Sequence, residues 1–201
     1  FGAKEKAALT GVIDVPEGAW YQEEIQKAIQ MGTMKRDQKM RPNDNITRQE
    51  AFTVLARAFR ATGSTGDDLS GFLDANQVAS WATDGMGALV KAGYIQGSGG
   101  KLSPTKNITR AELAVIMNNM AKQYIKTPGT VTEVIPLGNV IVNVPGTTLK
   151  DVTVNGDLII GDGVGEGNVT LDNVVIKGDL IARGGGVNSI IIVGGGVEGK
   201  I

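Results

Sequence analysis

The sequence contains no cysteine and no histidine. Disulfides, thiolate or imidazole metal sites, and every catalytic triad that uses either residue are therefore excluded. Metal binding or acid–base catalysis would have to depend on carboxylates alone. We expect neither a metal site nor a cofactor.

Long apolar runs and a strong charge of either sign are also missing. No segment approaches the roughly 20 apolar residues that a membrane-spanning helix needs, and no signal-peptide pattern is present. The net charge of −1 provides no basic surface of the kind that nucleic-acid-binding proteins carry. The 201 residues allow one or two domains, and because the chain begins with Phe1 instead of Met, we expect a piece of a longer protein.

Composition changes near residue 128. Of the 29 glycines, 16 lie from Gly129 onward. The first 128 residues hold 16 basic and 13 acidic residues, whereas the remainder holds four basic and eight acidic ones. The mild basic excess of the first part suits an anionic partner, but solvated surface charge explains it equally well.

A five-residue motif occurs twice in the first part, as Ile46–Glu50 and Ile108–Glu112. In both copies a Thr is followed three residues later by Glu, and an apolar periodic segment follows. This pattern predicts a capping box, in which each side chain bonds a backbone N–H at the helix start. The capping pairs are Thr47 with Glu50 and Thr109 with Glu112.

Arginine occupies the same position in both motif copies, at Arg48 and Arg110. A cation in the first turn faces the positive end of the helix dipole, so another interaction should compensate for it. Free N–H groups beside a guanidinium form a place to hold a carboxylate or phosphate. The alternative is a surface arginine over an apolar face. We expect both arginines to contribute little to folding and to recognise an anion.

The duplication extends well beyond the motif. A shift of 60 to 62 residues superposes Asp14 on Asp74, Trp20 on Trp81, Gly32 on Gly93, Pro42 on Pro104 and Arg48 on Arg110. Each unit reads as helix–loop–helix, with the glycine ending the first helix in a left-handed conformation. Apolar positions spaced by three or four residues predict the core-facing stripes of the four helices. These stripes are Ile25, Ala28 and Ile29; Ala51, Val54, Leu55 and Ala58; Met86, Leu89 and Val90; and Leu113, Ile116, Met117 and Met120.

The glycine-rich part repeats with a shorter period. A shift of 22 residues maps the segment 149–160 onto 171–182, and maps Val169 and Leu171 onto Ile191 and Val193. Each period holds three short alternating runs separated by a Gly-Asp corner and a glycine-rich loop. This pattern predicts a right-handed parallel β-helix-like solenoid, with segment 131–144 as its entry strands or a first irregular coil. A small antiparallel sandwich is the alternative, and the end at Ile201 suggests that more coils or a partner should cover the last one.

The first part resembles the S-layer homology (SLH) repeat of bacterial cell-surface proteins. The resemblance rests on an ordered set of landmarks: an opening Val-Ile-Asp-Val-Pro or Phe-Leu-Asp, a Trp before a helix, a Gly after it, a Pro in the loop and Ile-Thr-Arg-x-Glu. It implies a multidomain α + β chain in which helix–loop–helix units belong to a pseudo-trimeric spindle. The expected segments are a linker from a preceding repeat at 1–11, SLH repeats at 12–62 and 63–126, and the β-helix-like region at 127–201.

The resemblance also implies a function. SLH repeats hold surface proteins on the Gram-positive envelope by binding secondary cell-wall polysaccharide, often through a pyruvate ketal whose carboxylate meets the motif arginine. This implies an extracellular location at the cell wall or S-layer. Carried over to this sequence, the glycan-contacting and groove-shaping residues are Arg48, Arg110, Asp14, Asp74, Trp20, Trp81, Gly32 and Gly93. As alternatives, the two Asp are turn residues, the two Gly are helix C-caps, and the two Trp are core residues that at most show an edge to a sugar.

Catalysis is the competing interpretation of the glycine-rich part. Asp157, Asp162, Asp172 and Asp179 could be read as paired carboxylates or calcium ligands. Asp157 and Asp179 lie one period apart, however, and repetition at a corner is usually structural. We therefore expect an anchoring module and not an enzyme. The alternatives are a surface carbohydrate-active enzyme with its active site in or beyond the β-helix, and an S-layer subunit that assembles with itself.

Overall fold

A computed structural model describes residues 2–61, 64, 67–135 and 138–201. These residues form two compact units, one of residues 5–116 and one of residues 117–201 together with residues 2–4. Among the described residues, no helix is long and apolar enough to cross a membrane.

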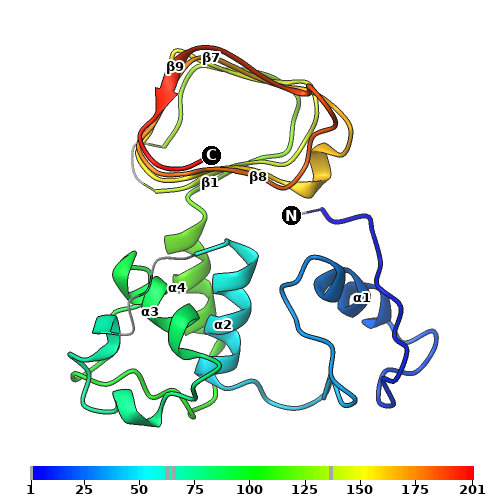
Figure 1. The fold of residues 1–201 in the computed structure, drawn as a ribbon, viewed down its shortest axis with the longest axis vertical. Helices are drawn as coiled ribbons and strands as arrows, with labels where there is room; N and C mark the ends of the chain where they lie inside the picture. Colours follow the sequence, from blue (N-terminus) through cyan, green and yellow to red (C-terminus); the bar gives the residue numbers. More distant parts are fainter. Residues whose placement is uncertain (1, 62–63, 65–66, 136–137) are drawn as a thin grey trace. The chain divides into compact units, whose positions relative to one another are not determined.

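The helical unit contains the expected pair of helix–loop–helix repeats. Its helices are α1 (Gln22–Gln30), α2 (Arg48–Ala58), α3 (Thr83–Lys91) and the first part of α4 (Arg110–Met120), with short 3-10 turns η1 (Asp67–Leu69) and η2 (Ala75–Gln77) before α3 (Figure 1). Helices α2 and α3 pack against each other. They approach closely because Gly85 has no side chain: a Cβ there would lie 3.2 Å from the Cβ of Ala56. The first helix of the second repeat therefore covers the second helix of the first.

The predicted core stripes are only partly right. On α2 the buried side chains are Ala51, Phe52, Thr53, Ala56 and Ala58, while Val54 and Leu55 are half-buried. On α4, Ile116 and Met120 are buried, but Leu113 and Met117 are exposed by 40% and 39%. Periodicity identifies the apolar face of a helix. It does not identify which neighbour covers that face.

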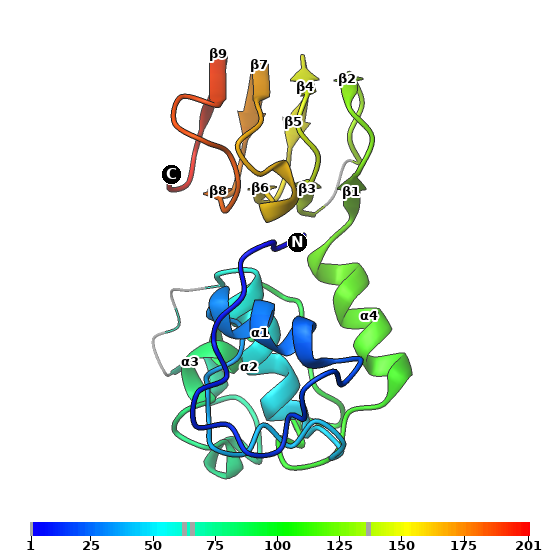
Figure 2. The ribbon, with the colours of Figure 1, turned by 90° about the vertical axis from the view of Figure 1, so that its right-hand side faces the viewer.

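The second unit is a parallel β-solenoid of about three turns, as the 22-residue period predicts. One sheet has the order β1 (Gln123–Ile125), β3 (Val140–Val142), β6 (Leu158–Ile160), β8 (Leu180–Ala182), and all its pairs are parallel. The other joins β2 (Gly129–Val131), β4 (Thr147–Lys150), β7 (Val169–Ile176) and β5 (Thr153–Val154), with β9 (Ile190–Val197) on β7 and the 3-10 turn η3 (Asp162–Val164) between β6 and β7. In Figure 1 the coils lie one behind another, because the view is along the direction in which they stack, and Figure 2 shows them side by side.

The coil registers confirm one predicted shift and correct another. Leu149 pairs with Leu171, and Leu158 with Leu180, at the predicted spacing of 22 residues. Val169, however, pairs with Ile190 and not with Ile191. The last shift is 21 because loop 183–189 is one residue shorter than loop 161–168. The handedness of the coil remains a prediction.

The interior of the solenoid is aliphatic. Its buried side chains come from all three segments of each coil, including Val140, Leu149, Val154, Leu158, Leu171 and Ile176. Asp151, between β4 and β5, and Asn173, at the equivalent place within β7, both adopt positive φ, at 54° each. The amide of Asn173 donates to the Asp151 carboxylate at 2.8 Å, so the bend is stacked from coil to coil. Strand β1 begins at Gln123, a few residues before the boundary placed at 126/127.

Candidate functional site

Both motif copies cap their helices as predicted. The Glu50 carboxylate accepts the N–H of Thr47 at 2.8 Å, and the Thr47 hydroxyl oxygen accepts the N–H of Glu50 at 3.4 Å. In the second copy the N–H of Thr109 donates to Glu112 at 2.8 Å, and the N–H of Glu112 donates to the Thr109 hydroxyl at 3.2 Å. The two helix starts are thus locally equivalent.

The N–H groups of the first turn differ between the copies. At the start of α2, the N–H of Arg48 donates to the carbonyl of Lys106 at 2.8 Å, and that of Gln49 donates to the carbonyl of Pro104 at 2.9 Å. The loop of the second repeat therefore already occupies the predicted anion site at this helix. The expectation of free N–H groups is wrong for α2.

The side chain of Arg48 is enclosed by the second repeat. Its Nε donates to the carbonyl of Leu102 at 2.7 Å, and its Nη1 forms an ion pair with the Glu112 carboxylate. The guanidinium also lies over the ring of Phe52, with Cζ 5.0 Å from the centroid. Only 12% of the side chain is exposed. Arg48 thus links the two repeats, and the expectation that it is a surface residue is wrong.

Arg110 holds the same position in α4 and has a different environment. It is exposed, and within the described parts of the chain its guanidinium has no hydrogen-bond or ion-pair partner. The N–H groups of Arg110 and Ala111 likewise have no acceptor there. The donors that the second repeat occupies at α2 are therefore open to a ligand at α4.

The motif glutamates are held in their charged form. For Glu112 the N–H of Thr109 is the largest cause of a lowered pKa, burial opposes it, and the positive charge of Arg48 adds to it. For Glu50 burial raises the pKa, but hydrogen bonds outweigh this effect, and the net pKa is lowered. One of those bonds comes from Arg41, whose Nη2 lies 3.0 Å from the Glu50 carboxylate. Both glutamates pair their second carboxylate oxygen with an arginine, but only Glu112 pairs with an arginine of the other repeat.

The two repeated aspartates clamp the loop between the helices of each repeat. Asp14 accepts the N–H groups of Met40 and Arg41, at 2.8 and 2.7 Å. Asp74 accepts the N–H groups of Leu102 and Ser103, both at 2.8 Å. In each repeat the second of the two bonded residues has positive φ. The turn-residue alternative therefore accounts for both carboxylates.

The two clamps differ in burial. Asp74 is only 4% exposed, whereas Asp14 is half-buried. In each case burial raises the pKa, but the two N–H donors outweigh it and leave the pKa below its usual value. Both carboxylates therefore remain ionised in the folded chain at neutral pH.

Gly32 and Gly93 end α1 and α3 as predicted, with φ of 72° and 73°. The N–H of the residue after each glycine bonds back to the last turn of its helix. A Cβ at either glycine would meet nothing within 4 Å. Left-handed backbone alone thus explains both glycines, as the C-cap alternative states, and a groove-shaping role remains a prediction.

The tryptophans are not core residues. Trp20 is 89% exposed and contacts the ring of Tyr21 edge-on at a centroid distance of 5.4 Å, and Trp81 is 50% exposed. Both precede the first helix of their repeat, each in a turn that a local backbone hydrogen bond closes. The alternative that both tryptophans are core residues is therefore wrong, and their contact with a glycan remains a prediction.

Sequence reasoning missed the residues that join the repeats. Gln49 accepts the N–H of Ala79 from the second repeat at 3.0 Å, and Glu112 binds Arg48 in addition to its cap. Exposed apolar side chains before each clamp, Ile13 and Leu73, also went unnoticed. An available signal was that Arg and Glu recur together in both motif copies, so that each copy offers the other a partner.

The stacked aspartates of the solenoid bond its backbone. Asn139, Asp157 and Asp179 form a column in which each Oδ1 accepts the N–H of the corner residue one coil later, at 2.8, 2.9 and 2.8 Å. Burial raises the pKa of Asp157, and the charge of Asp179 adds to that effect. The remaining two candidates pair with cations: Arg183 donates to Asp162 at 3.0 Å and Lys150 to Asp172 at 2.8 Å.

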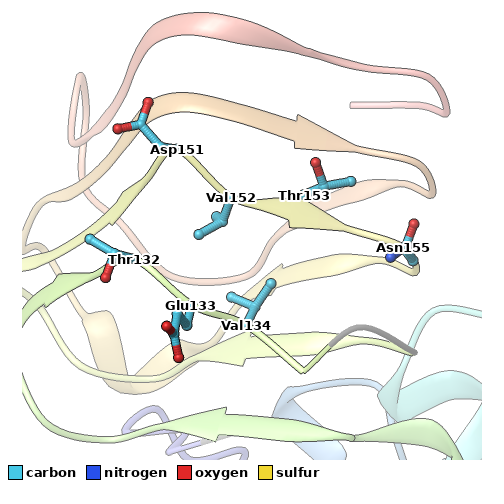
Figure 3. A pocket seen from close by; sticks show the side chains of 7 residues that line it. All are labelled: Thr132, Glu133, Val134, Asp151, Val152, Thr153 and Asn155. Atoms are coloured by element: carbon cyan, nitrogen blue, oxygen red, sulfur yellow. The ribbon is translucent and has the colours of Figure 1, made fainter.

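A surface pocket of about 490 Å³ lies on the solenoid (Figure 3). It is lined by Thr132, Glu133, Val134, Asp151, Val152, Thr153 and Asn155. Figure 3 shows the carboxylates of Glu133 and Asp151 on separate segments and pointing away from each other. Within the part of the chain that the structure describes, no three acidic residues gather where they could hold a metal ion. The two carboxylates of this pocket therefore do not face each other.

Comparison with known proteins identifies the repeats. The S-layer homology domain family matches residues 14–52 and 71–114. The chain is 34% identical over 125 residues to the exoglucanase XynX of Acetivibrio thermocellus, covering 60% of this chain and 12% of that protein. It is 35% identical over 121 residues to the surface-layer 125 kDa protein of Lysinibacillus sphaericus, covering 57% of this chain and 10% of that protein. The amylopullulanase of Thermoanaerobacterium thermosulfurigenes is 31% identical over 115 residues, with 55% and 6% covered.

The family matches cover the two helical repeats and not the solenoid. Two S-layer homology repeats, of the kind found in S-layer-type surface proteins, are followed by a parallel β-solenoid. Such repeats imply a location at the bacterial cell surface, anchored to the cell wall. The chain spans only about a tenth of the length of these relatives, and both S-layer proteins and enzymes are among them.

Proposed function

We propose that the repeats anchor a surface protein by binding an anionic, pyruvate-bearing secondary cell-wall polysaccharide, and that Arg110 is the main carboxylate contact. The observation that carries the proposal is the contrast between two equivalent arginines. Arg48 is paired with a carboxylate and enclosed, whereas Arg110 is exposed and without a partner among the residues described.

The occupied site at α2 indicates the ligand chemistry that suits the free one at α4. At α2 a carboxylate pairs with the guanidinium, and two carbonyl oxygens accept the N–H groups of the first turn. A sugar ketal of pyruvate carries a carboxylate beside ring and ketal oxygens, which is a comparable set of acceptors. Arginine suits it because its planar fork can make two parallel bonds to a carboxylate.

Arg48 has a different place in this proposal. Its Nη1 is already paired with Glu112, which is also bound to the N–H of Thr109, and its Nε is bonded to the carbonyl of Leu102. We therefore assign Arg48 to the joint between the repeats, and direct glycan contact by Arg48 is secondary.

The exposed indoles are proposed as further contacts for the glycan. A tryptophan face offers a large apolar surface to the C–H groups of a pyranose, and its N–H remains free for a hydroxyl. Trp81 is half exposed on the same repeat as Arg110. We propose that Trp81 and Trp20 contact sugar rings while Arg110 selects the charge.

Binding of the full chain to purified Gram-positive cell-wall sacculi tests this function. Arg110→Ala should weaken binding by about ten- to a hundredfold, since a lost hydrogen bond to a charged group costs about 1.5–3 kcal/mol. Arg110→Lys should rescue poorly. Arg60→Gln removes one exposed positive charge at the end of α2 and serves as the matched control. Equal binding by the parent and Arg110→Ala, or an unchanged Arg110 effect on sacculi stripped of pyruvate, would exclude the proposed contact.

We further propose that the chain serves as anchor and scaffold without catalysis of its own. The support is that Asp157 and Asp179 are engaged as backbone acceptors in a coil-to-coil column. A second candidate is the anchor of a surface carbohydrate-active enzyme, because two relatives carry enzyme names. Polysaccharide cleavage by the parent chain that is lost in Asp157→Asn/Asp179→Asn would favour catalysis within this chain.

A further inference from the structure

Gln49 forms hydrogen bonds with the second repeat at two places. Its backbone N–H donates to the carbonyl of Pro104 at 2.9 Å. Its side-chain Oε1 accepts the N–H of Ala79 at 3.0 Å, in a half-buried position. Gln49 thus reaches from the first turn of α2 to the segment that leads into α3.

The side chain of Gln49 bonds the turn that carries Trp81. The N–H of Ala82 donates to the carbonyl of Ala79 at 2.8 Å and closes the turn. Ala82 itself is completely buried, and the hydroxyl of Thr83 donates back to Ala79 at 3.3 Å. Both ends of the turn are therefore held, and Trp81 lies between them with half of its surface exposed.

The equivalent turn of the first repeat lacks this support. It is closed by the N–H of Gln22 donating to Ala19 at 2.9 Å. Its other hydrogen bonds are also local: the N–H of Ala19 donates to Pro16 at 3.2 Å, and the N–H of Gly18 donates to the Gln22 side chain at 2.8 Å. Trp20 in that turn is 89% exposed. At the position equivalent to Gln49, the second motif copy has Ala111, which has no side-chain acceptor.

We propose that Gln49 is a positioning residue for Trp81: by holding the Ala79–Ala82 turn it keeps the indole preorganised as a stacking surface for a sugar ring. This inference rests on the proposed glycan-binding function. A platform that is already ordered loses less conformational freedom on binding, so its contribution to affinity is larger. The Trp20 platform, whose turn is bonded only within its own repeat, contributes less.

The first test needs no ligand. The chain has two tryptophans, so the Trp20→Phe background makes Trp81 the sole indole reporter. In that background Gln49→Met, which keeps side-chain length but removes the acceptor, should speed local motion of the indole in fluorescence anisotropy decay and raise acrylamide quenching. Gln49→Glu retains an acceptor oxygen and should stay close to the parent. Gln22→Met, the same change beside the other turn, should leave the Trp81 signal unaltered.

The second test measures binding of the full chain to purified cell-wall sacculi. Gln49→Met should weaken binding by about threefold to tenfold, the range expected for immobilising one side chain. It should have no further effect in the Trp81→Ala background. An equal loss in that background would mean that Gln49 acts on the fold and not through Trp81, and would overturn the inference.

The two tests separate failure of the inference from failure of the proposed function. Unchanged anisotropy and quenching in Gln49→Met overturn the positioning role whatever the binding result. Altered fluorescence with unchanged binding shows that the ordered indole does not serve the ligand, and also overturns it. If the parent itself does not bind sacculi, the proposed function fails and the inference, which rests on it, fails with it, although the fluorescence result still decides whether Gln49 orders Trp81.

Discussion

The starts of α2 and α4 have nearly the same sequence and the same capping box, yet one is closed and the other is open. At α2 the guanidinium and two N–H groups are bonded by the neighbouring repeat. At α4 the corresponding donors have no partner among the residues described. The comparison shows that a motif defines which donors converge, while the neighbouring repeat decides whether they support the fold or remain open to a ligand.

The largest difference between the repeats should come from their loop clamps. Asp74→Ala leaves the N–H groups of Leu102 and Ser103 without their charged acceptor in a buried place, which should cost about 3 kcal/mol of unfolding free energy. Asp14→Ala breaks the same two bonds at a more exposed site and should cost clearly less. Urea unfolding of the full chain, followed by tryptophan fluorescence, measures both. Equal losses would mean that burial of the clamp does not set its strength.

The two arginines should separate next. Arg48→Ala leaves the Glu112 carboxylate and the Leu102 carbonyl without their donor and removes the contact with the Phe52 ring. We therefore expect the unfolding free energy to fall by about 2 kcal/mol. Arg110→Ala breaks no bond in the described structure, so its unfolding free energy should change by no more than about 0.5 kcal/mol. The same urea experiment applies. If both variants unfold like the parent, the Arg48 joint does not stabilise the helical unit.

The capping threonines provide a finer comparison. Thr47→Ala and Thr109→Ala should each lower stability by about 1 kcal/mol, because each removes the acceptor for a helix-start N–H. The loss at Thr47 should be the larger, since its cap also holds the turn that bonds the second repeat. Thermal melts of the two variants test this order. Unchanged melting in both would contradict the capping geometry.

The smallest effect should distinguish the helical unit from the solenoid by its pH dependence. The lowered pKa values of Asp74 and Glu112 stabilise the helical unit above the unfolded carboxyl values near pH 4, and that stability is lost as the pH falls through the folded values. The raised pKa of Asp157 acts in the opposite sense: its favourable contribution is complete below the unfolded value and is lost as the pH rises through the folded one.

Asp157→Asn should therefore be neutral or slightly stabilising at pH 7, by less than about 1 kcal/mol, with a smaller difference at pH 4. Asparagine suits the column because Asn139 already accepts an N–H in the same way one coil earlier. Hydrogen exchange measured separately over the strands and the helices reports each unit. Greater protection of the strands in the parent than in the variant at pH 7 would reverse the expected sign.

Local features of the chain were predictable from sequence for a physical reason. Capping boxes, left-handed glycines after helices and the Gly-Asp corners depend on residues within a few positions of each other, so short patterns report them. The coil period was equally readable because each strand must present aliphatic side chains inward at the same place in every turn. The register error of one residue at Ile190 arose where a loop shortened, and loop length leaves no mark on strand periodicity.

Sequence patterns were enough to predict duplicated helix–loop–helix units with capped helices, followed by a parallel solenoid. Which arginine is enclosed and which aspartate is buried depend on contacts between segments that are distant in sequence, so they became visible only in the folded chain. The pairing of Arg48 with Glu112, and of Gln49 with Ala79, joins residues 64 and 30 positions apart. A guanidinium or an indole becomes structural or available according to the neighbour that packs beside it, and that neighbour is set by the folded arrangement of the repeats.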